Sequence, residues 1–317
     1  MKQAPFEAAH AREWGEFEAF LEKKPSFDPA ELPARFRRVC QSLALAAERH
    51  YSTALVDRLN RLALRGHHAL YVNRRRESQQ VLGFILAGFP RLVRQEWRLV
   101  AAAALLFFGP LLGLVVVLQY FPDFVHYLLS PKQIADFHEM YDPANRRLGM
   151  READTSLLMF GFYIWNNVRI GFQTFAGGML AGVGTAWFLG GNGVILGAVA
   201  GYLTQVGYTE TFWSFVAGHS SLELLAIVLS GAAGFKLGLA IVSPKNLSRK
   251  AALVAAARPA VRIMYGAAVM FLGAAFVEAF WSPLTEIPFP VKIAAGISGW
   301  VILLAYFAFA GRGHAAR

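Results

Sequence analysis

The hydrophobic and polar positions divide the chain into an amphipathic first third and a largely apolar remainder. In residues 7–22, Trp14, Phe17 and Leu21 recur at helical spacing. Two further amphipathic helices are expected at about 29–51 and 53–71. One amphipathic helix cannot bury its own apolar stripe, so we expect the three to share a core. Residues 80–98 predict a helix lying in a membrane interface. We therefore predict a basic cytosolic helical domain over residues 1–98.

Residues 99–317 contain apolar stretches of the length needed to cross a membrane. The stretch 156–190 exceeds one span and is interrupted by polar residues at 166–169, which predicts a broken helix there. Gly190, Gly191, Asn192 and Gly193 are typical of a tight turn. The expected spans are 99–121, 156–190 with its break near 166–169, 194–206, 218–242, 262–281 and 291–310. The fold class is all-α: a polytopic membrane bundle of about six transmembrane helices, some broken, with an N-terminal cytosolic domain.

Lysine and arginine are unevenly distributed between the connecting segments, and this distribution predicts an orientation. Residues 1–98 hold seventeen of them, and the 243–262 segment holds five. Because cytoplasmic segments are enriched in these residues, both termini are expected in the cytoplasm. Residues 156–217 then begin and end outside. Either two crossings or a short re-entrant hairpin at 194–206 satisfies that requirement, and two crossings are preferred.

Composition agrees with a membrane protein and excludes several other classes. Of the 317 residues, 56% are hydrophobic and 16% charged, whereas soluble domains have about 25% charged residues. The net charge of +10 lies mostly in segments that flank the membrane, where it attracts anionic lipids. The single cysteine, Cys40, excludes an intrachain disulfide and any multi-cysteine metal site.

Ionisable and amide side chains interrupt the apolar region, where each is costly unless it pairs or lines a wet cavity. His219 and Glu223 are four residues apart and so share one helix face. We interpret them as a hydrogen-bonded structural pair. The alternatives are a gating or proton-relay pair, a metal site, which would need further ligands, and hydrolysis by Glu223 with a base. Arg169 is expected to pair with Glu223 or Glu278, or else to bind an anion or a lipid headgroup. The predicted polar intramembrane core comprises Asn166, Asn167, Arg169, His219, Glu223, Lys236 and Glu278.

Glycines recur at four-residue spacing in the same region, which lets helix backbones approach closely in lipid. Such a surface either packs helices together within one chain or forms the contact face of a homodimer. The residues expected in helix packing or dimerisation are Gly178, Gly182, Gly184, Gly193, Gly197, Gly201, Gly234 and Gly238.

Two groups of arginines in the N-terminal domain form a basic surface. They are solvated, or lie on anionic lipid, or dock an acidic partner such as a cytosolic ATPase. They are not interleaved with exposed aromatic residues, so nucleic acid is not an expected partner. The residues are Arg58, Arg61, Arg65, Arg74, Arg75 and Arg76.

The chain contains no Walker A sequence, no GxSxG, no cysteine pair and no HExxH. We therefore expect a protein that is not an enzyme, with no catalytic residues, no cofactor and no metal. An intramembrane enzyme, which would need a paired acid and base, is the weakest alternative.

Several segments resemble the stage II sporulation protein M family, and the likeness covers nearly the whole chain. They are Trp14 to Pro25, Phe36 to Ala47, Leu59 to Tyr71, the Asn166–Asn167 pair, Phe175 to Thr185, Asn192 to Gly197 and Gly218 to Leu224. The resemblance implies a polytopic membrane protein without established catalytic residues. It also implies protein partners, either a peptidoglycan-active enzyme or a MoxR-type AAA ATPase.

The functional hypothesis is therefore a non-enzymatic scaffold or anchor for an envelope or peptidoglycan-remodelling complex, in contact with membrane lipids. The alternative is a transporter or channel-like protein that uses His219, Glu223 and Arg169 as a polar intramembrane site.

Overall fold

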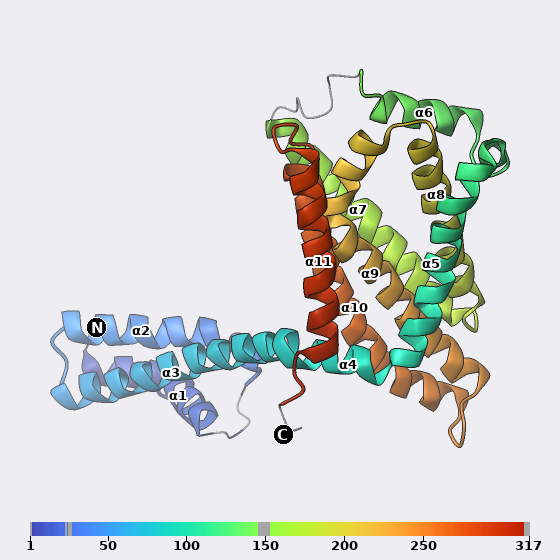
Figure 1. Ribbon diagram of the computed structural model, residues 1–317. Coiled ribbons are helices and arrows are strands. Elements are labelled where there is room, and N and C mark those ends of the chain that lie inside the picture. The colour runs from blue at the N-terminus through green and yellow to red at the C-terminus, as the bar shows by residue number, and fades with distance from the viewer. Residues whose placement is uncertain (1, 23, 25–26, 145–152, 314–317) are drawn as a thin grey trace. The chain divides into compact units, whose positions relative to one another are not determined.

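The computed structural model describes residues 2–22, 24, 27–144 and 153–313, with the side chains of 71–78 and 153–155 excepted. Within those ranges the regular structure is helical, without strands (Figure 1). The chain divides into two compact units, Met1–Phe84 and Ile85–Arg317. The all-α class predicted from the apolar pattern is confirmed.

The first unit is a three-helix domain with its own core. Its helices are α1 (Gln3–Leu21), α2 (Leu32–Glu48) and α3 (Thr53–Gly83). Trp14 and Phe17 from α1, Val39 from α2 and Leu59 from α3 are almost fully buried together. The shared apolar stripe therefore explains the packing, as the helical spacing predicted.

The boundary between the units lies at residues 84 and 85 rather than at residue 98. A short helix, α4 (Phe89–Gln95), belongs to the second unit because its side chains pack there. The Phe89 ring occupies the space left by the absent side chain of Gly266 and contacts Phe307. The predicted interfacial helix thus becomes part of the membrane bundle.

The second unit is a bundle of six long helices that run in alternating directions (Figure 1). They are α5 (Trp97–Tyr120), α7 (Ala153–Ala176), α8 (Val183–Gln205), α9 (Thr209–Val242), α10 (Arg249–Phe280) and α11 (Phe289–Phe309). We call the end that carries α4 the α4 end, and the opposite end, which carries α6 (Pro131–Tyr141), the α6 end.

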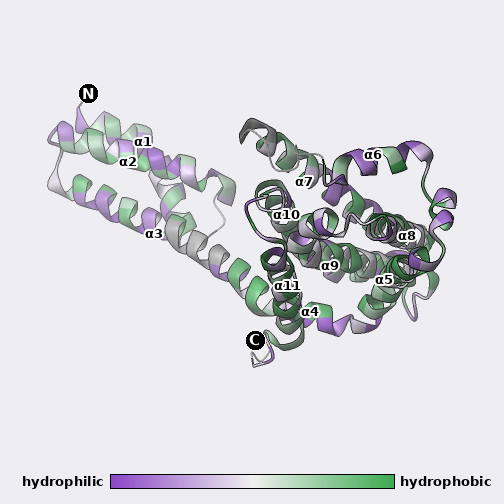
Figure 2. Cartoon of the chain, turned by 45° about the horizontal axis from the view of Figure 1, so that its top comes forward, coloured by the Kyte–Doolittle hydropathy of each residue, from purple (hydrophilic) through white to green (hydrophobic). Residues whose placement is uncertain are grey.

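Five of these helices are long and apolar enough to cross a membrane, judged over the described residues: α5, α8, α9, α10 and α11. Figure 2 shows their mostly hydrophobic colouring. The α7 helix has the length but is more polar, because Asn166, Asn167, Arg169 and Gln173 lie in its second half. The unit is therefore a membrane helix bundle.

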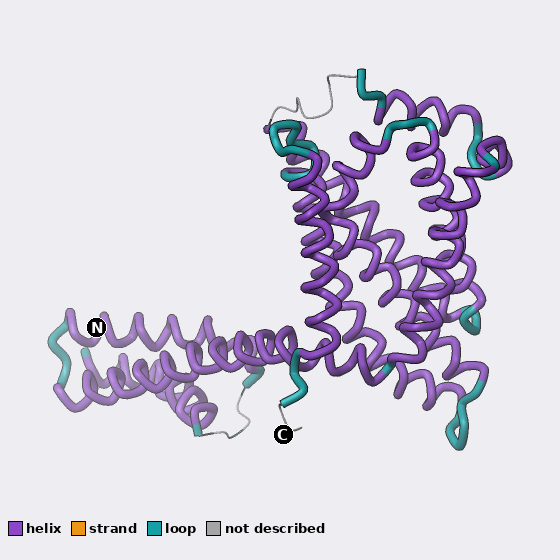
Figure 3. Tube along the Cα trace, viewed as in Figure 1, coloured by secondary structure: helices purple, strands orange, loops and turns teal. Residues whose placement is uncertain are grey.

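The break in the long apolar stretch lies at a different place from the one predicted. The α7 helix runs through residues 166–169 without interruption, and α8 runs through 190–193 (Figure 3). The chain turns instead at residues 177–182, where Gly182 adopts a φ of +85°. A side chain would disfavour that conformation, so glycine fits the turn. Asn192, predicted in a turn, instead donates its amide to the Phe188 carbonyl within α8.

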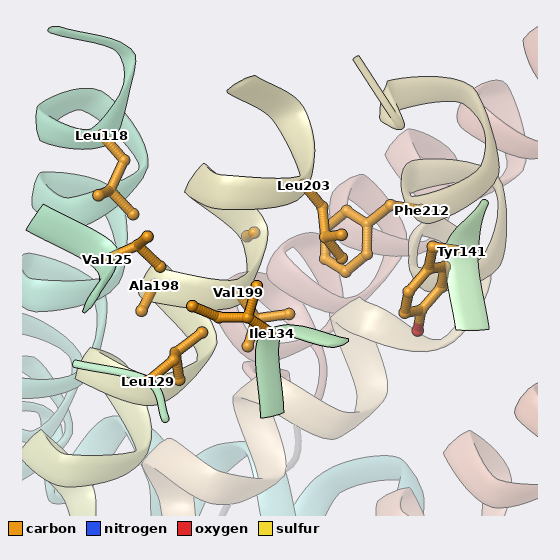
Figure 4. Packing of buried hydrophobic residues seen from close by; sticks show 10 residues of the cluster. Leu118, Val125, Leu129, Ile134, Tyr141, Ala198, Val199, Leu203 and Phe212 are labelled. Atoms are coloured by element: carbon orange, nitrogen blue, oxygen red, sulfur yellow. The ribbon is translucent and has the colours of Figure 1, made fainter. Parts of the chain in front are cut away.

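The segment after α5 folds into a short 3₁₀ helix (Pro122–Tyr127) followed by α6. Ser130 and Gln133 form a capping box at the start of α6. Side chains from this segment join α5, α8 and α9 in one apolar cluster, shown in Figure 4. Its labelled members are Leu118, Val125, Leu129, Ile134, Tyr141, Ala198, Val199, Leu203 and Phe212. The segment therefore covers the α6 end of these helices.

Candidate functional site

Three ionisable side chains from two helices of the bundle meet inside it. His219 and Glu223 come from α9, and Glu278 comes from α10. One nitrogen or oxygen from each lies within 4.8 Å of the others, and His219 Nε2 is 3.6 Å from Glu223 Oε2. We call these three residues the His–Glu cluster. His219 is only 3% exposed, and both carboxylates are largely enclosed.

Helix periodicity and close packing explain why these side chains converge. His219 and Glu223 are one turn apart on α9 and therefore face the same way. Glu278 occupies the last turns of α10. Gly218 lets the Trp281 ring approach α9, and Gly296 lets α11 approach Ala217 of α9, because a Cβ at either position would overlap its neighbour. The two helices that carry the cluster, α9 and α10, are thus closely packed, and α11 packs against α9 beside them.

Ser282, directly after α10, connects the cluster to a buried lysine. Its hydroxyl lies 3.0 Å from His219 Nδ1, so it fixes the orientation of the imidazole ring. Its carbonyl accepts a hydrogen bond of 2.7 Å from Lys292 Nζ. Lys292, near the start of α11, is 4% exposed, and its ammonium also lies over the Trp281 ring. One serine therefore links a histidine and a cation.

A cavity of about 250 Å³ adjoins this arrangement at the α6 end. Ser282 and Lys292 form part of its wall, so the cavity reaches the serine that holds His219. Glu210, in the first turn of α9, contributes an acidic group to the same wall. The cavity therefore provides polar surroundings next to the His–Glu cluster.

Sequence reasoning identified His219, Glu223 and Glu278 but missed Ser282 and Lys292. Ser282 follows the last helical residues of an apolar span and carries no motif. Lys292 is the lone charged residue in α11, which was a usable signal, because a charge within a span requires a partner.

Arg169 does not join the cluster, contrary to the prediction that it pairs with Glu223 or Glu278. Its side chain is exposed, and its guanidinium lies 4.6 Å from the centre of the Trp165 ring and 3.5 Å from Asn166 Oδ1. Both partners are on α7 itself. The reason is geometric: the helix continues through this region, and Arg169 lies on the face that points away from the bundle.

The two asparagines of α7 differ in their surroundings. Asn166 is half-buried and donates to Asn167 Oδ1 over a long 3.4 Å. Asn167 is 1% exposed, and its amide nitrogen has no hydrogen-bond partner among the described residues. The helix is intact here, so neither side chain bonds to backbone groups of an unwound segment, as the predicted break at 166–169 would have required.

Lys236 forms an ion pair of 2.6 Å with Glu96 at the α4 end. Glu96 connects α4 to α5, so the pair links α9 to the start of the first long helix. The sequence analysis placed Lys236 in the polar intramembrane core and did not identify Glu96 as its partner.

The predicted packing glycines lie at close contacts inside the chain. A Cβ at Gly197 would be 2.7 Å from the Leu111 carbonyl oxygen, and one at Gly201 would be 2.9 Å from that of Leu114. Gly193 meets Phe107 in the same way, which completes one face of α8 against α5. The other members form the contacts of the α7–α8 turn, where Gly184 packs on Gly177, Gly178 on Gly234 and Gly182 on Gly238.

The predicted basic surface divides into paired and exposed residues. Arg58 and Arg65 lie 3.4 and 3.8 Å from the carboxylate of Glu18 within the first unit. Arg61 is exposed. The side chains of Arg74, Arg75 and Arg76 lie outside the described residues.

A family model described as Stage II sporulation protein M matches residues 102–283, more than half of the chain. A second model, described as a domain of unknown function (DUF8413), matches residues 4–72 in the first unit. No curated protein and no solved structure matches the chain.

Proposed function

Because the chain belongs to the stage II sporulation protein M family, we propose that it acts as a non-enzymatic scaffold or anchor in the bacterial inner membrane. The bundle would cross the membrane six times, with both ends of the chain in the cytoplasm. The basic flanking segments support this orientation.

The observation that carries the proposal is the first unit, which has a core of its own. Three helices bury Trp14, Phe17, Val39 and Leu59 among themselves, and a separate family model matches the same residues. A domain that is built independently of the bundle is suited to contact another protein. Exposed Arg61 supplies positive charge for an acidic surface.

Partners of two classes fit this arrangement. A MoxR-type AAA ATPase would meet the first unit in the cytoplasm. A peptidoglycan-active enzyme would meet the α6 end, where residues 122–141 form an ordered covering over α8 and α9. Both classes come from the family resemblance.

Affinity purification from native membranes tests the scaffold directly. Full-length protein with a C-terminal affinity tag is purified in mild detergent, and co-purifying proteins are identified by mass spectrometry. We expect stoichiometric recovery of a partner of one of these classes. A matched variant that lacks residues 1–84 should lose a cytosolic partner but keep one that binds the bundle. Recovery of the chain alone, as a monomer or homodimer, would overturn the proposal.

A transporter is the second candidate, and the His–Glu cluster beside the 250 Å³ cavity is the observation that favours it. Ion flux into liposomes would distinguish it from a scaffold. A transporter should lose flux in Glu223→Gln, whereas a scaffold should show no flux in either protein.

A further inference from the structure

We propose that the His–Glu cluster binds one divalent transition-metal cation of the zinc class. The three donors are His219 Nε2 and one carboxylate oxygen each from Glu223 and Glu278. No motif within one helix contains this donor set, because Glu278 is 55 residues beyond Glu223 and meets it only through the packing of α9 on α10.

The spacing of the donors fits a small metal ion. In a tetrahedral zinc site, ligands about 2.1 Å from the metal are about 3.4 Å from one another. The His219 Nε2 and Glu223 Oε2 atoms are 3.6 Å apart, and the full set lies within 4.8 Å. Small rotations of the carboxylates would therefore complete three-point coordination, with a fourth position left for water.

The type of donor selects the class of cation. Imidazole nitrogen favours zinc and its first-row neighbours, and carboxylates complete their coordination. A cluster that contains a histidine is poorly suited to magnesium or calcium, which prefer oxygen ligands alone. Residues 85–317 contain no cysteine, so the membrane unit supplies no thiolate to the site.

Charge balance supplies an independent argument. Two carboxylates that lie close together in an apolar interior repel each other when both are charged. One divalent cation neutralises both. Lys292 Nζ is directed towards the Ser282 carbonyl at 2.7 Å, where it lines the adjoining cavity.

Ser282 acts as the supporting residue that metal-bound histidines usually have. Its hydroxyl lies 3.0 Å from Nδ1 and can accept the proton of that nitrogen. Nε2 then keeps its lone pair, and this is the nitrogen that faces Glu223. The cavity that Ser282 lines lies next to the cluster, on the side of His219.

The test measures metal binding by the purified full-length chain, carrying a Strep tag in place of a polyhistidine tag. Chelator-treated protein is dialysed against Zn²⁺ or Mn²⁺, and bound metal is counted by mass spectrometry. We expect one ion per chain in the wild type and less than a tenth of that in His219→Asn and Glu278→Gln. Glu210→Gln removes an acid from the cavity wall but not from the cluster, so it should retain one ion.

Two further readouts guard against loss of folding. Ser282→Ala keeps all three ligands, and it should weaken Zn²⁺ binding about tenfold, as for other supporting residues. Zn²⁺ should also raise the thermal unfolding midpoint of the wild type but not that of Glu278→Gln. Equal metal content in the wild type and a correctly folded Glu278→Gln would overturn the site, as would a wild type that binds no ion. Partner recovery is measured separately, so the scaffold proposal can fail without affecting this one.

Discussion

At the residue scale, the environment of the single cysteine determines how the chain reacts with thiol reagents. Cys40 is half-buried on α2, and this burial raises the pKa of its thiol above the ordinary value. The thiolate is the reactive form, so less of it is present at a given pH. The same shift means that the folded state loses stability as pH rises through the raised pKa, because the unfolded chain releases this proton more readily.

We predict that iodoacetamide modifies Cys40 severalfold more slowly at pH 8 than it modifies an exposed cysteine. The control is Cys40→Ser combined with Arg61→Cys, which places the only thiol at an exposed position of α3. The difference should shrink as pH rises, because both thiols become ionised. Equal rates at pH 8, followed by mass spectrometry, would contradict the assigned burial.

The role of Ser282 could not be predicted from the sequence. Two of its atoms organise His219 and Lys292, yet a serine at the end of an apolar helix has no pattern that predicts a role. His219 and Glu223 were identifiable because a spacing of four places them on one face. Glu278, the third member of the cluster, could be predicted to lie in the polar core, but its position beside His219 and Glu223 could not. Helix packing rather than local periodicity brings it to them.

At the element scale, glycines determine how closely α8 approaches α5. A Cβ at Gly197 would lie 2.7 Å from the Leu111 carbonyl oxygen, closer than folded proteins tolerate. At Gly191, on the same helix, no described atom outside the local helix backbone lies within 4 Å of the corresponding position. Alanine at either position changes helix propensity, but only at Gly197 would it also disturb the contact with α5. Comparing the two variants therefore isolates the effect of the contact.

We predict that Gly197→Ala lowers the thermal unfolding midpoint in detergent, at a cost of about 1–3 kcal/mol for overpacking. Gly191→Ala should leave the midpoint unchanged or raise it slightly, because alanine favours a helix by up to about 1 kcal/mol over glycine. Similar midpoints in the two variants would show that the close α5–α8 contact does not exist.

The elements themselves were largely predictable, and their interruptions were not. Runs of apolar residues predicted helices in the regions of α5, α9, α10 and α11. The α9 and α10 helices begin nine and thirteen residues before the predicted spans of 218–242 and 262–281, because a helix continues into polar residues beyond the apolar run. The breaks predicted from polarity and glycine content were wrong. Asn166, Asn167 and Gly190 suggested interruptions, but they lie inside continuous helices. The real turn at Gly177–Gly182 contains no charged residue, and only its packing against α9 marks it.

At the scale of the whole molecule, the α7–α8 turn decides whether residues 156–217 cross the membrane twice. Gly182 packs on Gly238, near the end of α9, so the turn reaches the α4 end of the bundle. The two helices have 24 and 23 residues, long enough to span the hydrocarbon at about 1.5 Å per residue. This favours two crossings over a re-entrant hairpin.

We predict that Leu180→Cys and Leu247→Cys, each in a Cys40→Ser background, react with a membrane-impermeant maleimide only after permeabilisation. Thr285→Cys, in the connection between α10 and α11, should react in intact cells. All three native side chains are exposed, so burial does not account for the contrast. Reaction of Leu180→Cys in intact cells would show that the turn lies on the outer side.

The arginines of α4 close the bundle from its first element to its last. Arg94 donates to the carbonyls of Phe307 and Ala310, and Arg91 donates to that of Gly311, all at the end of α11. During synthesis these acceptors leave the ribosome more than 210 residues after their donors. A nascent chain therefore cannot close the α4 end of its membrane unit until α11 has been made. A chain truncated before residue 307 would lack all three acceptors and would retain an open seam for quality-control proteases to recognise.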